Sequence, residues 1–271
     1  MSSKIGSIIK FPVQAFKNPR KLLKTLLAFS IETESIEDYN HFSANRDIKF
    51  IDLIDVIPDF DQEIKSFSFL EGTSRITDIA LLMSLAKRVK DCDYLEIGSW
   101  RGESLLNVSR FCRKATSLSL SKSEMESCGF SKEAAEADGY FIKDISNLER
   151  ILHNSLTFDF STLNRKFDLI FVDGDHRRDA VVSDTKNVFN LLKDENSIIV
   201  WHDAGNTYND IRHEVMAGIL EAATAEQRKH IYRVSNTLCA IYINGAFIEM
   251  KGNNYIPKHV FDVQLKLSNA I

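Results

Sequence analysis

The fold is indicated by one short stretch, residues 94–104, which reads YLEIGSWRGES. Its first four residues are typical of a short strand, and two glycines, Gly98 and Gly102, flank a loop that leads into a helix. Glycine lets a ligand approach the backbone closely, and the start of a helix offers unpaired N–H groups. The stretch therefore predicts a strand–turn–helix unit with a ligand-binding turn of the form E-x-G-x-x-x-G.

This turn differs from the dinucleotide fingerprint G-x-G-x-x-G, whose closely spaced glycines and helix dipole serve a pyrophosphate. Here Glu96 lies at the end of the strand, and an acid suits a cationic ligand without phosphate. Glycine-rich turns of this kind also occur in many α/β folds for packing reasons alone. The later strands are therefore needed to decide the function.

Two later strands end in clusters of ionisable residues. The strands are predicted at 167–172 and 196–201, and the residues that follow them are Asp173, Asp175 and His176, and then His202 and Asp203. Ligands in open α/β sheets bind beyond the carboxyl ends of the strands. We expect the two strand ends to face one crevice.

The alternation of strands and helices predicts the architecture. Further strands are expected near 115–120 and 139–142, amphipathic helices at 73–90 and 181–192, and a hairpin at 231–243. Alternation of this kind implies a parallel sheet. We predict an α/β, Rossmann-like, doubly wound sheet of seven strands, mostly parallel, with an antiparallel C-terminal hairpin strand and helices on both faces.

The chain resembles the class I S-adenosylmethionine (SAM)-dependent methyltransferases. The resemblance rests on V-D-G-D-H at 172–176 and W-H-D-A at 201–204, and it covers most of residues 67–243. It implies a methyltransferase domain at 67–245. Residues 1–66 would then form an N-terminal basic amphipathic helix and accessory segment, and residues 246–271 a C-terminal cap.

The resemblance also implies a cofactor site. The implied cofactor-binding residues are Glu96, Gly98, Ser99, Gly102, Ser121, Asp144, Asp173 and Thr73. The first-strand loop would hold the methionine end of SAM, and Asp144 would contact the adenine after the third strand. The acid that usually grips the ribose after the second strand is replaced by serines, so Ser121 is left to supply a hydrogen bond.

The resemblance further implies catalytic residues and a metal. In related metal-dependent O-methyltransferases two strand-end acids, here Asp173 and Asp203, chelate a divalent ion such as Mg²⁺, although Ala204 stands where a further ligand is usual. His176 matches the base of similar sugar O-methyltransferases and would accept the hydroxyl proton. The implied reaction is O-methylation of a sugar, a glycan or another small hydroxyl acceptor. The alternative is a structural role, in which His176 only donates a hydrogen bond to a backbone carbonyl.

Two other functions remain open from the sequence. The serines after the second strand and Ala204 would also suit a catalytically degenerate SAM-binding protein. An NAD-dependent oxidoreductase on a similar sheet is disfavoured, because the glycine spacing is wrong and no ribose-binding acid follows the second strand.

Charge and composition restrict the partners and the location. The formal charge is -4, yet residues 1–31 contain six cations and no acid, so an acidic remainder argues against nucleic acid. A helix predicted to start with Asn18 as N-cap and Pro19 carries leucines on one face. It would contact an anionic membrane, the main domain or a second subunit of a homo-oligomer. Four cysteines without a C-x-x-C pair, and no long apolar run, favour a cytoplasmic protein, with peripheral contact at the inner membrane face left open.

Overall fold

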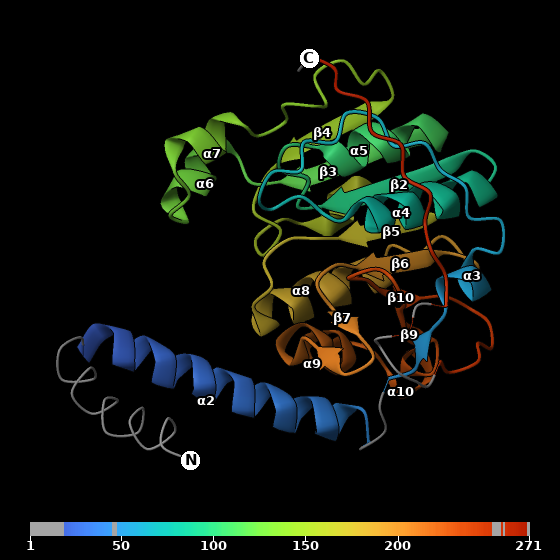
Figure 1. Cartoon of the computed structure of the whole chain (residues 1–271). Helices are drawn as coiled ribbons and strands as arrows, with labels where there is room; N and C mark the ends of the chain where they lie inside the picture. The colour runs from blue at the N-terminus through green and yellow to red at the C-terminus, as the bar shows by residue number, and fades with distance from the viewer. Residues whose placement is uncertain (1–18, 45–47, 251–255, 257, 270–271) are drawn as a thin grey trace, which may run out of the picture.

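The computed structural model describes residues 19–44, 48–250, 256 and 258–269. Its core is an eight-stranded sheet of order β1-β9-β10-β6-β5-β2-β3-β4 (Figure 1). The strands are β1 (Phe50–Ile51), β2 (Cys92–Ile97), β3 (Cys112–Ser119), β4 (Leu148–Leu152), β5 (Leu169–Val172), β6 (Ile198–Trp201), β9 (Ile231–Val234) and β10 (Ala240–Tyr242). Neighbours pair in parallel except β10, which is antiparallel to both β6 and β9.

The predicted fold class is confirmed, with one strand more than the seven expected. The extra strand is β1, which pairs in parallel with β9 at the sheet edge. It spans two residues and is too short to carry a periodic pattern, so it could not be predicted from the sequence.

Helices cover both faces of the sheet and bury two apolar layers (Figure 1). The helices that contribute to these layers are α3 (Leu53–Val56), α4 (Ile76–Arg88) and α5 (Glu103–Val108) on one face, and α8 (Arg178–Phe189) and α9 (His213–Ala222) on the other. The short helices α6 (Lys122–Ser127) and α7 (Lys132–Glu136) lie beside the sheet (Figure 1), and further short elements are α10 (Ala225–Arg228) and 3₁₀ turns at Ser109–Phe111 and Phe160–Leu163. Alternate residues of one strand enter opposite layers: Tyr94 packs with α4 and Leu95 with α8 and α9. Strands buried on both faces explain the continuous apolar runs in the sequence.

One predicted strand is wrong. Residues 139–142 form turns, in which the N–H of Gly139 donates to the Trp100 carbonyl and the N–H of Phe141 to the Arg101 carbonyl. The strand next to β3 is instead β4, whose charged residues Glu149 and Arg150 are exposed at the sheet edge. A half-exposed edge strand has a weak apolar signal, whereas the aromatic run before it resembles a strand.

The N-terminal helix is longer than expected. Helix α2 (Pro19–Phe42) continues through the acidic residues after Ile31, because neither glycine nor proline interrupts it. Its C-terminal part packs on α9 through the buried Tyr39, and Arg178 of α8 pairs with both Asp38 and Glu221. Asn18, the predicted N-cap, lies outside the described residues.

Two segments lie outside the main sheet and its helices: a hairpin and the C-terminal tail. A small hairpin of β7 (Gly205–Thr207) and β8 (Asp210–Ile211) follows β6, and the buried Arg233 donates to its carbonyls at Thr207, Tyr208 and Asp210. The described tail lacks regular structure. Among the described helices, none combines the length and the apolar character that a membrane span requires.

Candidate functional site

The loop after β2 depends on its glycines. Gly98 has a φ of 92°, and a Cβ there would collide with the carbonyl oxygen of Asp173 at the end of β5. Gly102 has a φ of 88°, and a Cβ there would collide with Ile142. Only glycine combines this backbone conformation with such close approach, so the loop is held tightly against the neighbouring strand end.

Glu96 ends β2 as a buried carboxyl group with 1% of its surface exposed. The Tyr94 hydroxyl donates to Glu96 Oε2 at 2.6 Å, and the Ser104 hydroxyl donates to Glu96 Oε1 at 2.5 Å. Burial raises the pKa of Glu96 to about 7, and these two hydrogen bonds only partly offset the effect. A cationic ligand would therefore find a carboxyl group that it can help to ionise.

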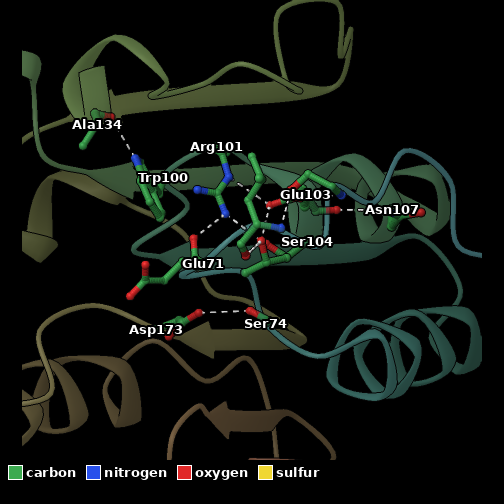
Figure 2. A network of polar contacts seen from close by, with 12 residues as sticks. Glu71, Ser74, Trp100, Arg101, Glu103, Ser104, Asn107, Ala134 and Asp173 are labelled. Carbon is green, nitrogen blue, oxygen red and sulfur yellow. Dashed lines mark hydrogen bonds and ion pairs between the residues drawn. The ribbon is translucent and has the colours of Figure 1, made fainter. Parts of the chain in front are cut away.

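A buried ion pair fixes the far side of the loop. Arg101 Nε lies 3.3 Å from Glu103 Oε2, and the Arg101 guanidinium also donates to the Glu71 carbonyl and to Thr73 Oγ1 (Figure 2). Glu103 in turn accepts from the Ser68 hydroxyl and backbone N–H. The network ties residues 68–73 over the loop, so these residues form a wall of the site.

Together these residues enclose a small polar cavity beyond the carboxyl end of β2. Its lining residues are Gly72, Thr73, Ser74, Ile79, Gly98, Ser99, Trp100, Arg101, Glu103, Ser104 and Asp173. In Figure 2, Ser74 and Asp173 face each other across a hydrogen bond, and the two oxygens lie 3.2 Å apart. The predicted residues Thr73, Gly98, Ser99 and Asp173 thus line one cavity.

His202 bridges two acids at the end of β6. Its Nδ1 lies 3.1 Å from Asp173 Oδ1, and its Nε2 lies 3.0 Å from Asp78 Oδ2. Burial opposes a charge on His202, but the carboxylates of Asp173 and Asp78 outweigh it and raise the pKa of His202 well above its usual value. The imidazolium in turn lowers the pKa of Asp173 against the effect of its burial. The cluster keeps Asp173 ionised.

Asp203, the residue after His202, contacts two cationic or basic side chains. Its Oδ2 lies 3.1 Å from His176 Nε2 and 2.8 Å from Arg212 Nη1. Its φ of 58° is unusual for a residue other than glycine and directs the side chain toward His176. Ligand atoms of Asp173, His176 and Asp203 all lie within 4.8 Å of one another. The structure thus brings together the three predicted catalytic residues.

A wider groove opens beside Asp203, with about 660 Å³ of free space that includes its open mouth. It lies between α2 and the β7–β8 hairpin, and its lining residues are Glu32, Asp203, Gly205, Asn206, Asp210, Ile211, Arg212 and Leu238. Arg75 Nη1 donates to Asn206 Oδ1 at 2.7 Å and anchors the hairpin to the start of α4. Asp203 therefore joins the groove to the cluster that borders the cavity.

The serine region after β3 is accounted for by helix capping. Ser121 caps α6, and Glu124 accepts from the Ser121 N–H and hydroxyl and from the N–H of Asn154. The Ser121 hydrogen bonds lower the pKa of Glu124. Ser119, the last residue of β3, has a neutral hydroxyl group where a carboxylate is usual. This hydroxyl accepts a hydrogen bond from the Ser99 hydroxyl at 3.3 Å.

The predicted position of Asp144 is wrong. It is an exposed turn residue that precedes β4, which begins at Leu148. The residues that follow the carboxyl end of β4 are His153 and Asn154. The error follows from the strand expected at 139–142, since a shifted strand moves its end to another residue. Asn154, an amide, takes the place that Asp144 was expected to fill.

Three residues that organise the site were not predicted from the sequence. Asp78 is fully buried in α4 and holds both His202 and the N–H of Leu238. An acid within an apolar helical pattern was the available signal. Arg101 and Arg212 act through partners far along the chain or across a loop, and no local pattern predicts such pairs.

The strand order, the glycine loop and the acidic strand ends define a Rossmann-like fold with a ligand site at its carboxyl edge. Residues 95–204 match the protein family described as a methyltransferase domain. This match, together with the Rossmann-like sheet, supports a class I SAM-dependent methyltransferase. A search of curated proteins finds no match to the chain.

Several solved structures are similar to the chain at low identity. The O-methyltransferase TomG of Streptomyces achromogenes, in complex with SAM, is 17% identical over 64% of this chain and 82% of its own, with a TM-score of 0.44. An O-methyltransferase of Bacillus cereus, in complex with S-adenosylhomocysteine (SAH), has the same identity and coverage and a TM-score of 0.45. The N-methyltransferase NodS of Bradyrhizobium japonicum is 17% identical over 55% of this chain and 74% of its own, with a TM-score of 0.40.

Proposed function

We propose that the chain transfers the methyl group of SAM to a hydroxyl oxygen of a sugar, a glycan or another small acceptor. One observation carries the proposal: His176 Nε2 lies 3.1 Å from Asp203 Oδ2, and Asp203 also borders the groove, while the neighbouring Asp173 borders the cavity. A base between the two sites can take the proton of an acceptor hydroxyl in the groove while the acceptor oxygen attacks the methyl group of SAM held in the cavity.

The cavity suits the methionine end of SAM. Glu96 precedes the glycine loop and accepts a hydrogen bond from Ser104, a residue that lines the cavity, so its carboxyl group can ionise in favour of a nearby ammonium group. The ionised Asp173 adds a negative charge that favours a sulfonium. SAM supplies an electrophilic methyl group on that cationic sulfur. The chain contributes proximity and orientation, which account for most of the acceleration in such a displacement.

In this reaction Asp203 determines which nitrogen of His176 accepts the proton. If Asp203 accepts an N–H from His176 Nε2, then Nδ1 is the nitrogen without a proton and can take one from the acceptor hydroxyl. Asp203 would stabilise the imidazolium that forms, and Arg212 holds the carboxylate in place at 2.8 Å. The tautomer is thus fixed by the hydrogen bond on the opposite nitrogen.

The same cluster supports a second mode, in which a divalent ion is bound. Asp173, His176 and Asp203 offer two carboxylates and an imidazole close enough to share one ion. A bound ion would orient the acceptor hydroxyl and lower its pKa. Carboxylates suit Mg²⁺, whereas an imidazole ligand favours a transition metal such as Mn²⁺. His176 cannot be a ligand and a base at once, so the two modes exclude each other.

The groove suits a polyhydroxyl acceptor. Carboxylates at Glu32 and Asp210, the Asn206 amide and the Arg212 guanidinium line it, and they accept or donate hydrogen bonds to hydroxyl groups. Glu32 is held by His213, whose Nδ1 lies 3.0 Å from Glu32 Oε1. Few apolar side chains line this groove, which favours sugars over phenolic rings.

Calorimetric titration with SAH, with and without Mg²⁺ or Mn²⁺, tests the cofactor site. We expect micromolar binding, unchanged by Asp144→Ala and weakened by Glu96→Ala. An acceptor screen then follows SAH release with methyl glycosides, oligosaccharides and catechols. Turnover on sugars supports the proposal. Binding without turnover on any acceptor would support a degenerate SAM-binding protein, and no binding at all would overturn the cofactor assignment.

A further inference from the structure

Helix α2 carries a stripe of exposed apolar side chains. The stripe consists of Leu23, Leu27 and Ile31, of which 68%, 59% and 42% of the surface is exposed, and Leu26 flanks it at 55%. Phe29, 72% exposed, lies on the opposite side of the helix. In Figure 1 the N-terminal half of α2 extends past α8 and α9. Exposed apolar residues gathered on one element mark an interaction surface more often than residues scattered singly.

The N-terminal half of α2 has little tertiary support. Between residues 19 and 34 every described side chain except Leu22 is exposed, whereas the first buried residue is Ser35. Isolated helices of this length are marginal in water, and most helical stability comes from packing of an apolar face. The stripe did not dock on the main domain, one of the partners expected from the sequence. A partner outside the chain would stabilise this half.

The charges at the ends of the stripe are complementary. Arg20 precedes the stripe and Glu34 follows it, and both are exposed. The residues of this row are Arg20, Leu23, Leu27, Ile31 and Glu34, which follow one another at spacings of three or four and so lie along one side of the helix. A second α2 laid antiparallel, with its centre at Leu27, would place opposite charges together at both ends.

We infer that two copies of the chain associate through α2, antiparallel and related by a two-fold axis. Leu27 of one copy would pack on Leu27 of the other, and Arg20 of each copy would face Glu34 of the other. Such an isologous interface uses the same patch on both subunits. A parallel arrangement would instead bring like charges together. The pairing also sets the second copy beside the groove, because Glu32 lines the groove next to Ile31.

An anionic membrane is the less suitable partner. The cations Arg20, Lys21 and Lys24 are followed on the same helix by the acids Glu32, Glu34, Glu37 and Asp38. Anionic lipids attract the first group and repel the second. Within the chain Glu32 is held by His213 and Asp38 by Arg178, while the antiparallel copy pairs Arg20 with Glu34 at both ends, which is why the charge distribution favours a second copy.

Sedimentation equilibrium of the full chain, over about 1 to 100 µM, measures the association. We expect a dimer for the wild type and a monomer for Leu27→Asp. Leu156→Asp is the matched control, because Leu156 is a similarly exposed leucine on a different part of the chain. Unchanged SAH binding and circular dichroism would show that Leu27→Asp has not unfolded the domain.

A charge-reversal pair tests the antiparallel register. Arg20→Glu and Glu34→Arg each create two repulsive contacts in their own dimers, whereas a mixture of the two variants restores attraction at both ends. We expect the mixed dimer to form with a dissociation constant about tenfold lower than either variant alone, and the advantage to shrink at 1 M NaCl. A parallel wild-type dimer would already bring like charges together, so neither single variant would weaken it; weakening of both single variants relative to the wild type is therefore the result that requires the antiparallel register.

Three results would overturn the inference: a wild-type monomer at 100 µM, a dimer that survives Leu27→Asp, or mixing that brings no gain. Flotation with vesicles of phosphatidylcholine and phosphatidylserine supplies the remaining comparison. Vesicle binding by a monomer, abolished by Leu27→Asp, would assign the stripe to a membrane instead. SAH binding reports separately on the proposed methyltransferase function.

Discussion

His176 and Asp203 lie side chain to side chain, with 3.1 Å between Nε2 and Oδ2, although they follow two different strands of the sheet. The contact joins the carboxyl ends of β5 and β6. The contact orients His176, and it places a carboxylate beside the positive charge that His176 would acquire on accepting a proton.

His176→Gln should abolish catalysis and leave cofactor binding intact. Glutamine cannot accept the proton, and general-base contributions are about 10² to 10⁴ in rate. Initial rates with an acceptor found in the screen measure the loss, and calorimetry with SAH should give a dissociation constant within about twofold of the wild type. His41→Gln, an exposed residue of α2, is the control. A fully active His176→Gln would remove His176 from the mechanism.

If the site binds a divalent ion, turnover should depend on that ion. If a divalent ion is bound by Asp173, His176 and Asp203, then EDTA should stop turnover and Mn²⁺ should restore it. Asp203→Asn would then lower metal affinity, which calorimetry with Mn²⁺ measures without any acceptor. Turnover that is unaffected by EDTA, together with no heat on Mn²⁺ titration, would contradict this mode and favour His176 as base.

Cofactor binding should strengthen as the pH rises through about 7. Burial raises the pKa of Glu96 to about 7, and in the proposed cofactor site its ionised form would favour the ammonium group through its negative charge. Binding below that pKa must first remove a proton, so affinity should increase about tenfold between pH 6 and pH 8. SAH titrations across this range provide the measurement. Glu96→Gln should bind more weakly at pH 8 and show a flat profile; a sloping profile in this variant would assign the effect to another group.

The Asp78–His202 contact should stabilise the fold in a pH-dependent manner. The pKa of His202 is raised in the folded state, so its contribution is fully present below the unfolded value of about 6.5 and is lost as the pH rises through the folded pKa. Asp78→Ala breaks a buried pair and should cost about 3 kcal/mol at pH 6.5. Denaturant unfolding at pH 6.5 and pH 9.5 checks both statements. An equal loss at both values would mean that His202 is not charged.

Asp184 should destabilise the fold above pH 6. It is 1% exposed in α8, and burial raises its pKa to about 6, with the Ser155 hydroxyl offsetting only part of the effect. The unfolded chain ionises from about pH 4, so stability falls between pH 4 and pH 6, by about 3 kcal/mol. Asp184→Asn should therefore raise the unfolding midpoint at pH 7.5 and leave it unchanged at pH 4. The exposed Asp179→Asn, on the same helix, should change neither.

The sequence was sufficient where a local pattern carries the signal. The glycine loop could be located because only glycine permits the φ of Gly98 and its contact with the next strand end. Parallel strands bring their carboxyl ends to one edge, so Asp173 and Asp203 could be predicted to meet from the strand pattern alone. The placement of Asp144 was wrong because β4 is a partly exposed edge strand whose apolar signal is weak.

Local sequence determined the class of fold, the cofactor loop and the acids that end β5 and β6, because strand periodicity, glycine and strand-end chemistry act within a few residues. Only the tertiary structure decided which side chains pair. Asp78 reaches His202 across 124 positions, and α2 meets α9 far along the chain. Such contacts depend on how the helices pack over the sheet, and their energy arises from burial and electrostatics between distant segments, which no short window of sequence contains.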